Sequence, residues 1–529
     1  MERIAAATIS PWPRGRVPKR FEHYELNDEF GILSKWACHT RTMTNTPVAA
    51  PSGTAAPKER GPQSMFYKAG IPVLLVVAIY FLPTPAGVDP QGMHMLGIFV
   101  GTIVALILQP LPTGSVALIG LAVAMITGTQ IPADALSGFS NATIWLIVAS
   151  FFIAQGFLVT GLGERIALLF VARLGRSSLG LSYGMALTDL VLAPATPSNT
   201  ARAGGVVYPI IVSLSKLEGS EPEPEESRKR LGAYLLLTSL QVNVVTSAMF
   251  VTAMAANPLA VAAAAKLGVN ISWSKWALAA SVPGIASLIA VPWVMSKIYP
   301  PTVTSTPEAP AHARERLRSI GSMTRSEIIM AGTFVLLLAL WCTGSQLDIN
   351  ATSVAFTGVA ILLTTRVLSW KNIVTDTGAW QTLVFFAVLV GMATQLQKYG
   401  VITWVGHEVS HSVAGVPWLV AFAVLTLVYF YAHYLFASNT AQVVAMYAVF
   451  VGAAIATGAP PLFAALVFGF IGSLFGGLAH YSSGPAGVVF GSGFVKTSEW
   501  FRVGFVMSVM LILIWTVLGG AWLKVLGIW

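Results

Sequence analysis

The tripeptide Ser-Asn-Thr occurs twice in this chain, at positions 198–200 and again at 438–440. Its hydroxyl and amide groups donate hydrogen bonds, which suits the binding of an anion, and its oxygens also suit a hard cation such as sodium. A single copy is typical of an ordinary loop or helix cap, whereas two copies at matching places predict one paired binding site. The candidate substrate ligands are Ser198, Asn199, Thr200, Ser438, Asn439 and Thr440.

Each motif lies inside a long apolar segment, 181–217 in the first half and 417–457 in the second. Polar and proline-containing breaks at membrane depth are tolerated only where the chain lines a cavity. We therefore expect two re-entrant hairpins, each with its motif at the tip beside a helix N-terminus, whose free N–H groups and dipole favour anions. Two facing tips would hold the two carboxylates of one small molecule.

A polar break follows each motif at a similar distance along the chain. Paired interrupted segments in corresponding positions are the best sequence indication of a transporter's binding site. We therefore add the residues of both breaks to the predicted substrate site. They are Ser247 in the first half and Ser482, Ser483, Gly484 and Pro485 in the second.

Ionisable residues near the motifs are candidate charge partners for a bound anion. Arg202 follows the first motif and is expected either to balance substrate charge or to reach the cytoplasmic face. Asp189 lies within the first hairpin, where it is costly unless paired or near water. His433 and His480 precede the second motif and the second break, as charge partners or as hydrogen-bonded packing residues.

Composition indicates lipid as the main solvent. The 529 residues are 55% apolar and only 10% charged, whereas soluble domains carry roughly a quarter charged residues. The two cysteines, Cys38 and Cys342, exclude a disulfide scaffold or a thiolate metal site. The net charge of +9 does not indicate nucleic acid, because the basic residues lie between apolar blocks or in the N-terminal part.

Apolar blocks of membrane-spanning length recur in two similar halves. In each half, spans are followed by an amphipathic stretch (164–176 and 401–413), an interrupted segment, and further spans. We therefore expect an all-helical membrane protein with repeats at 67–298 and 326–529. The spans before and after the interrupted segments are expected at 69–83, 93–109, 112–128, 142–160, 231–256, 276–298, 327–343, 351–367, 379–397, 461–492 and 503–526.

Charge asymmetry predicts the orientation. With the N-terminus inside, the loops around Arg173, Arg228, Arg316 and Lys496 are cytoplasmic, and few basic residues remain outside, as the positive-inside rule requires. The arrangement has about eleven full spans and places the two hairpins on opposite sides, which is an inverted-topology repeat. Residues 299–325 are then a cytoplasmic linker.

Residues 1–66 contain no apolar block and are expected to be a disordered tail. The segment lacks the apolar core of a secretory signal and carries an acidic cluster that transit peptides avoid. Met43 is an alternative start site.

The segments APATPSNTARAGG (193–205), TSAMFVTAMAANPLA (246–260) and 476–495 resemble the divalent anion/sodium symporter family, also called the INDY group, in its 2-oxoglutarate/malate translocator branch. The similarity spans roughly residues 66 to 529. It implies a homodimer in which a mobile transport domain moves against a scaffold domain as an elevator. It also implies malate, 2-oxoglutarate, succinate or a similar dicarboxylate as substrate, and location in a bacterial inner membrane or, alternatively, the plastid inner envelope.

One departure from the family bears on coupling. Its sodium-coupled members often have a hydroxyl residue four positions before each motif serine, but here these positions hold Pro194 and Tyr434. This favours exchange of dicarboxylates over sodium-coupled symport, which stays open as the alternative; sodium, if bound, would use Ser198, Asn199, Ser438 and Asn439. An intramembrane enzyme is disfavoured because no nucleophile–base pair or metal-spaced His/Glu set lies at matching depth. A channel is disfavoured because matched broken hairpins suit alternating access.

Overall fold

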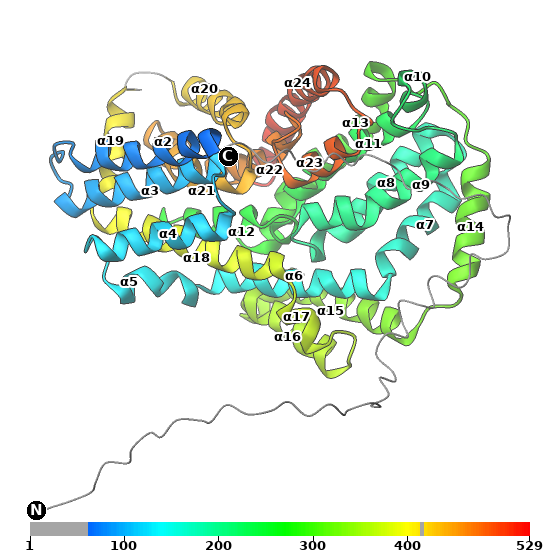
Figure 1. Ribbon diagram of the computed structural model, residues 1–529, viewed down its shortest axis with the longest axis horizontal. Helices are drawn as coiled ribbons and strands as arrows, with labels where there is room; N and C mark the ends of the chain where they lie inside the picture. The colour runs from blue at the N-terminus through cyan, green and yellow to red at the C-terminus, as the bar shows by residue number, and fades with distance from the viewer. Residues whose placement is uncertain (1–61, 413–416) are drawn as a thin grey trace, which may run out of the picture. The chain divides into compact units, whose positions relative to one another are not determined.

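The computed structural model describes residues 62–412 and 417–529, and within these ranges the chain forms helices and no extended strand. The expected N-terminal tail and the alternative start at Met43 therefore lie outside the described residues, apart from the last few residues of the tail. The helices follow one another along the chain in two similar series (Figure 1).

The first series ends with a helix in the linker predicted at residues 299–325. Its members are α2 (Pro62–Tyr80), α3 (Pro90–Leu108), α4 (Thr113–Ile126), α5 (Pro132–Leu136), η1 (Ser137–Ser140), α6 (Ala142–Thr160), α7 (Leu162–Leu174), α8 (Ser178–Leu192), η2 (Ala193–Ala195), η3 (Ala201–Val207), α9 (Tyr208–Leu217), α10 (Glu225–Arg228), α11 (Gly232–Met249), η4 (Val251–Ala253), α12 (Ala256–Lys266), α13 (Trp273–Ile298) and α14 (Glu308–Ile320).

The second series runs to the C-terminus. Its members are α15 (Arg325–Leu347), α16 (Ala351–Thr364), α17 (Trp370–Val374), α18 (Thr377–Lys398), α19 (Val401–Ser412), α20 (Trp418–Tyr431), η5 (Ala432–Leu435), α21 (Asn439–Ala456), α22 (Pro461–Leu474), η6 (Phe475–Gly477), α23 (Gly484–Gly491), α24 (Thr497–Leu513), η7 (Ile514–Leu518) and α25 (Gly519–Val525).

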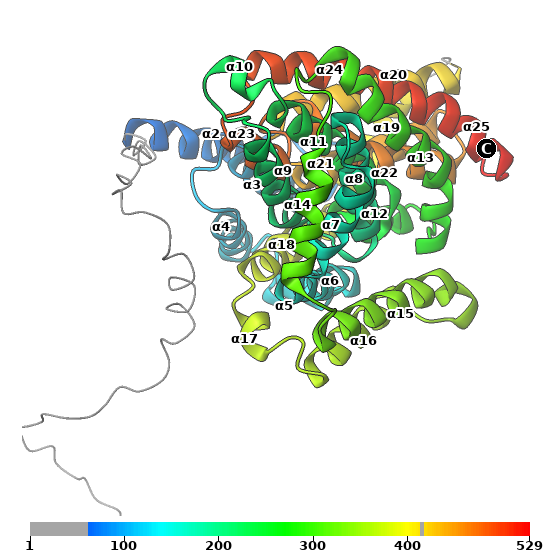
Figure 2. The same ribbon diagram turned by 90° about the vertical axis from the view of Figure 1, so that its right-hand side faces the viewer.

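The spans agree with the sequence-based prediction. Among the described residues, nine helices are long and apolar enough to cross a membrane, and two of them are the arms of the second interrupted segment. Four shorter apolar helices, in α2, α4, α16 and the α22–η6 segment, bring the full spans to the predicted number. The linker differs from the expected polar loop, because α14 forms within it and packs against α7 (Figure 2).

The two series correspond element by element. In each, a long span (α6 or α18) leads to an amphipathic helix (α7 or α19) and then to a helical hairpin interrupted at its motif. A broken span follows each hairpin, α11–η4–α12 in the first series and α22–η6–α23 in the second, and these breaks contain the polar runs noted in the sequence. Paired hairpins and paired broken spans are the architecture that the sequence predicted.

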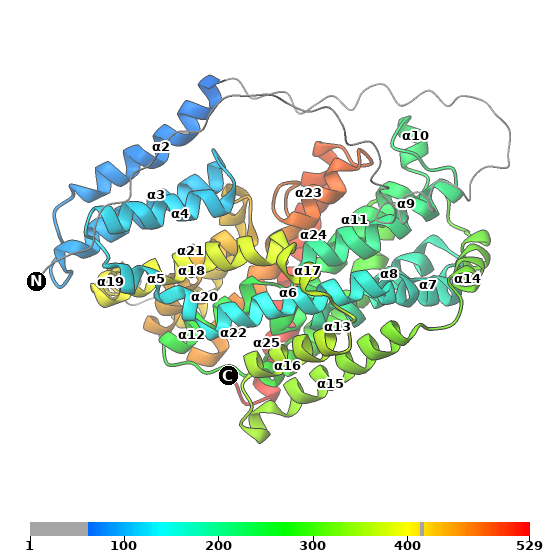
Figure 3. The same cartoon turned by 60° about the horizontal axis from the view of Figure 1, so that its bottom comes forward.

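Helix α11 is enclosed by other helices along its whole length. Every one of its residues is buried, it packs against α13, α8 and α22, and Figure 3 shows it beside α8. Polar contacts join the two breaks nearby: the Asn257 amide nitrogen donates to Ser247 O at 2.7 Å, and its Oδ1 accepts from Ser473 Oγ at 3.1 Å. The first bond satisfies a backbone carbonyl at the helix break, as an apolar environment requires, and the second links the side chains of the two broken spans.

Loop contacts join segments that the charge asymmetry places on the same side. On the predicted outer side, Asp89 N–H donates to Tyr399 O at 3.0 Å, and Lys398 pairs with Asp134 at 3.4 Å. On the predicted cytoplasmic side, Arg165 in α7 pairs with Glu327 at the start of α15 at 2.6 Å. The contacts therefore group the loops as the prediction does, and which group is cytoplasmic stays a prediction.

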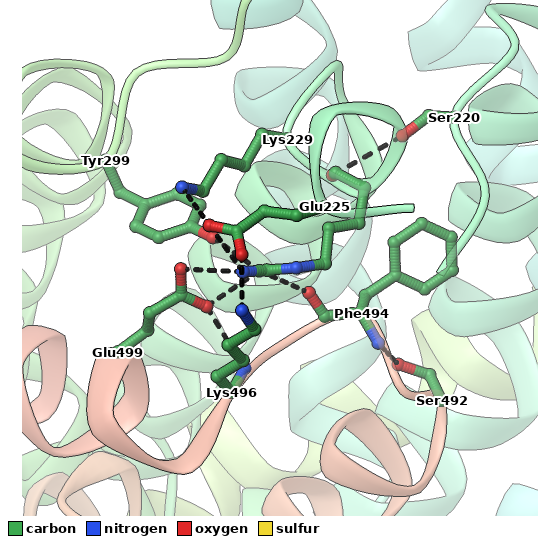
Figure 4. Close-up of polar contacts among 9 residues, drawn as sticks. Ser220, Glu225, Lys229, Tyr299, Ser492, Phe494, Lys496 and Glu499 are labelled. Carbon is green, nitrogen blue, oxygen red and sulfur yellow. Dashed lines mark hydrogen bonds and ion pairs between the residues drawn. The ribbon is translucent and has the colours of Figure 1, made fainter. Parts of the chain in front are cut away.

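A buried arginine ties the two halves together on the predicted cytoplasmic side. Arg228 in α10 makes two hydrogen bonds to the Glu499 carboxylate in α24, at 2.7 and 3.0 Å, and one to the Tyr299 hydroxyl at 3.1 Å. Figure 4 shows Glu499 and Tyr299 converging there, with Glu225 between Lys229 and Lys496. The hydrogen bond to Glu499 raises the pKa of Arg228, so the Arg228 side chain stays charged at physiological pH.

Two residues near Arg228 also keep one protonation state around neutral pH. Hydrogen bonds from Lys229 and then Lys496 lower the pKa of Glu225 to about 2. Burial, acting against the arginine, raises the pKa of Tyr299 to about 12. Neither group titrates near neutral pH, so this cluster is not a pH switch.

Candidate functional site

Both Ser-Asn-Thr motifs line one cavity of about 310 Å³. Its volume lies at the small end of ligand pockets, which span about 300–1,000 Å³. The motifs share their wall of the cavity with residues of the two breaks. These are Met254, Ala255, Ser483 and Gly484. Within the described residues, no charged side chain lines the cavity, so the site consists of neutral donors and acceptors.

The two motif serines have the same structural role. Ser198 Oγ accepts from Ala201 N–H at 3.1 Å, and Ser438 Oγ accepts from Ala441 N–H at 3.4 Å, so each serine caps the helix that starts at its motif. A capping hydroxyl uses an oxygen lone pair and keeps its own hydrogen available. Each tip therefore presents a hydroxyl donor beside a helix N-terminus, which is favourable for an anion.

The two motif asparagines differ. The Asn199 side chain is half-buried, lines the cavity and has no hydrogen bond to another described residue. The Asn439 amide nitrogen instead donates to Gly472 O at 3.1 Å and Ser473 O at 3.3 Å, at the end of α22. The sequence-based prediction assigned both side-chain amides to the substrate. In the structure, only the Asn199 amide has no hydrogen bond to another described residue.

The first hairpin tip meets the second broken span with no spare room. A Cβ atom added at Gly484 would lie 2.0 Å from Thr200 Oγ1, and one at Gly476 would lie 2.7 Å from the Asn439 amide nitrogen. Glycine at these two positions therefore allows the motif side chains to approach the broken helix.

We expect Gly484→Ala to impair transport strongly while the protein still inserts and purifies, because the new methyl group must displace the Thr200 side chain from the cavity. Uptake by reconstituted protein measures the loss, about tenfold or more if a hydrogen bond to a charged ligand is lost. The double variant Gly484→Ala/Thr200→Ser keeps the hydroxyl oxygen, so the close contact with the new methyl group remains. The double variant Gly484→Ala/Thr200→Ala lacks this oxygen, so the close contact is relieved. If the Gly484→Ala variant transports like the unmodified protein, Thr200 does not need its observed position.

Arg202 differs from both sequence-based interpretations. Its side chain is fully buried and pairs with Asp189, with Nε 3.1 Å from Oδ1, so it neither reaches the cytoplasm nor lines the cavity. Its Nη1 donates to Thr196 O at 2.6 Å and Ala253 O at 2.8 Å, and Nη2 donates to Ser247 Oγ at 3.0 Å. Arg202 thus joins the hairpin tip to the break after α11, and Asp189 balances its charge.

The second half repeats this arrangement without charge. Arg202 bonds to a residue thirteen positions earlier, Asp189, and Gln442 likewise bonds to a residue thirteen positions earlier, donating from Nε2 to Tyr429 O at 2.6 Å. Arg202 and Gln442 also hold the same position after their motifs. The two bonds therefore join corresponding positions of the repeat, although Arg202 donates to a carboxylate and Gln442 to a backbone carbonyl.

The histidines take different positions. His433 is fully buried, stacks on Phe475 and bonds through Nδ1 to Gln442 Oε1 at 2.6 Å and through Nε2 to Ser482 O at 2.9 Å. His480 is half-buried against Phe490, and its Nδ1 has no partner among the described residues. Neither lines the cavity.

Three other predicted site residues lie behind the cavity wall. Ser247 accepts from Arg202, Ser482 Oγ accepts from Ala479 N–H at 2.8 Å, and Pro485 is buried within the first turn of α23. Of the predicted break residues, Ser483 and Gly484 line the cavity, although the Ser483 hydroxyl already donates to Gly476 O at 2.9 Å. The breaks therefore mainly shape the site.

The opposite wall of the cavity was missed by sequence reasoning. It comes from the end of α3, the start of α4, α6 and the first turns of α18, segments that are remote from both motifs in the chain. Its polar residues are Gln109, Thr113, Gln381 and Thr382, and its aromatic residues are Phe151, Phe385 and Phe386.

A larger cavity of about 530 Å³ lies elsewhere, between α7, α9 and α14. It contains none of the motif residues, and its charged residues Glu164 and Arg316 pair with each other at 3.0 Å. We assign the functional site to the smaller cavity because the two halves of the repeat meet there.

A membrane-spanning helical fold with two interrupted hairpins meeting at one polar cavity defines a membrane transporter. Comparison with known proteins agrees: the family model described as the sodium:sulfate symporter transmembrane region matches residues 63–529. The chain belongs to this family, which confirms the resemblance inferred from the motifs. Its known relatives are transporters and not enzymes.

Three relatives match over most of their length. The Bacillus subtilis protein named "Putative malate transporter YflS" is 48% identical, with 90% of this chain and 100% of that protein covered. "Dicarboxylate transporter 1, chloroplastic" of Arabidopsis thaliana is 43% identical, with 95% and 93% covered. The "Citrate/succinate antiporter" of Escherichia coli is 35% identical, with 84% and 95% covered.

Proposed function

We propose that this protein exchanges one C4 or C5 dicarboxylate for another across the inner membrane. The observation that carries the proposal is the meeting of two hairpin tips, each with a serine hydroxyl donor beside a helix N-terminus, at one cavity. Two such tips match two carboxylates on one small molecule. The names of the relatives, which include malate, dicarboxylates, citrate and succinate, support this class of substrate.

The residues of the first half do not fit a sodium ion below the tip. A sodium ion in a broken helix is coordinated by unwound backbone carbonyls and hydroxyl oxygens. Here the carbonyls of Thr196 and Ala253 and the hydroxyl of Ser247 accept hydrogen bonds from Arg202. The guanidinium thus takes the acceptors that a coupling cation would need, which favours transport without sodium.

In the second half, His433 bonds to a carbonyl of the broken span in a similar way. Because the Gln442 amide nitrogen donates to Tyr429 O, its oxygen faces His433 Nδ1, while Nε2 faces Ser482 O. An imidazole satisfies two acceptors only when both nitrogens carry hydrogen, which is the charged form. Burial opposes that charge, and a dianion bound at the neighbouring motif would favour it.

The charge of His433 can assist movement of the loaded site. Arg202 is balanced by Asp189, and an unpaired charge at membrane depth is costly by a few kcal/mol on insertion scales. Protonation of His433 when a dianion binds lowers the net charge that the loaded site carries across the membrane. This favours movement of the loaded site, as exchange requires.

We also propose that the site moves as an elevator within a homodimer, as the family resemblance implies. The two walls of the cavity support this division: hairpin tips and broken spans form one wall, and α3, α4, α6 and α18 form the other. Apart from Phe151 in the middle of α6, the second wall comes from helix ends that the charge asymmetry assigns to the cytoplasm, and we propose that this cavity is the cytoplasm-facing one.

The test is counterflow in proteoliposomes. We expect uptake of labelled malate to require internal unlabelled dicarboxylate and to stay unchanged when potassium replaces sodium. An empty-liposome control prepared from the same protein gives the background. Robust uptake into empty liposomes driven by an inward sodium gradient would overturn exchange and favour the alternative, sodium-coupled symport.

A further inference from the structure

One residue on the opposite wall of the cavity has an unusual backbone conformation. Gln109 ends α3 with φ 48° and ψ 58°, in the left-handed region, and its N–H donates to Ala105 O. Side chains other than glycine and asparagine rarely adopt this conformation at a helix end. Pro110 follows, and a residue before proline favours extended backbone. Two local preferences therefore oppose the conformation of Gln109.

The same residue lines the substrate cavity. Gln109 is exposed there, together with Thr113 and Gln381, and faces a wall that contains both motifs. Strained residues persist where the surrounding structure or function requires them, and they concentrate at binding sites. A glycine would satisfy the helix end without strain, but it would bring no amide to the cavity.

We propose that Gln109 binds the substrate in the cytoplasm-facing state, donating a hydrogen bond from its amide to a dicarboxylate oxygen that the hairpin tips leave on that side. The inference rests on the proposed function and identifies a specificity residue outside both motifs. Since Gln109 belongs to the cytoplasmic wall, it contributes to capture and release at that face and not at the outer face.

Two left-handed helix ends make a matched test available. Asp348 ends α15 with φ 53°, and its N–H donates to Gly344 O four residues earlier, as in the bond from Gln109 to Ala105. Asp348 is exposed and does not line the substrate cavity. Gln109→Gly and Asp348→Gly therefore both place glycine at a left-handed helix end, and only the first removes an amide from the cavity.

The measurement is dicarboxylate transport by inside-out and right-side-out vesicles, with the melting temperature of each purified variant. For Gln109→Gly we expect an unchanged or higher melting temperature and a half-saturating concentration about tenfold higher at the cytoplasmic face. The outer face should be unaffected, and Gln109→Met should show the same one-sided loss without relief of strain. Asp348→Gly should transport normally from both faces.

Several outcomes would overturn this inference. They are a normal cytoplasmic half-saturating concentration in Gln109→Gly, an equal loss at both faces, or the same loss in Asp348→Gly. Absence of dicarboxylate transport by the unmodified protein would instead refute the proposed function, so the two failures are distinguishable.

Discussion

Asn199→Ala is expected to abolish dicarboxylate uptake and leave the folded protein as stable as before. Its amide lines the cavity and has no hydrogen bond within the described residues, so truncation leaves no protein group unsatisfied. A lost hydrogen bond to a charged ligand costs about 1.5–3 kcal/mol, which is a tenfold or larger loss of affinity. Concentration dependence of uptake in proteoliposomes and the melting temperature in detergent measure the two effects separately.

Asn439→Ala provides the contrasting variant from the other half of the repeat. Its amide nitrogen donates to the carbonyls of Gly472 and Ser473 at the end of α22, and truncation removes this donor from both buried acceptors. Each buried unsatisfied group costs about 1–3 kcal/mol, so we expect loss of stability together with loss of transport. Wild-type affinity in both variants would show that the motif asparagines do not form the site.

Asp189→Asn is expected to destabilise the protein severely. The Asp189 carboxylate and the Arg202 guanidinium are both buried, and Asn243 and Thr246 also donate to this carboxylate. Removing one partner of a buried ion pair typically costs about 3–5 kcal/mol, because the remaining charge has no partner. The melting temperature and the yield of monodisperse protein in detergent measure the loss.

The double variant Asp189→Asn/Arg202→Gln separates charge from packing. It removes both charges and gives the first half the glutamine that the second half has at Gln442. Since no charge is left unpaired, we expect much of the lost stability to return. Transport should stay impaired, because Thr196 O and Ala253 O lose the donors that join the hairpin tip to the broken span. A double variant as unstable as Asp189→Asn would show that charge pairing is not the cause.

The spans, the hairpins and the paired motifs could be predicted because each depends on local sequence. Apolar length sets a span, and proline and polar residues set its interruption. The serines at positions 198 and 438 were assigned to helix N-termini from their place in the motif, and both do cap their helices. Similarity of the two halves then indicated which interrupted segments act together.

Other parts of the site depend on contacts between distant segments. Nothing local distinguishes Gln109 or Gln381 as cavity residues, because their proximity to the motifs is created by packing of α3 and α18. The pairing of Asp189 with Arg202 had a sequence signal, since each is costly alone and they are thirteen residues apart in one interrupted segment. The hydrogen bonds of the motif side chains were the least predictable feature: Asn199 and Asn439 have identical motif positions, but among the described residues only Asn439 has hydrogen-bond partners.

Equilibrium binding of labelled malate to the purified protein tests the central claim most directly. If the cavity between the two hairpin tips is a dicarboxylate site, the unmodified protein binds malate saturably in potassium buffer, unlabelled succinate competes, and propionate, with one carboxylate, does not. Asn199→Ala protein with an unchanged melting temperature should show no saturable binding in the same range. Saturable binding of equal affinity by the Asn199→Ala protein, or competition by propionate as strong as that by succinate, would contradict the account.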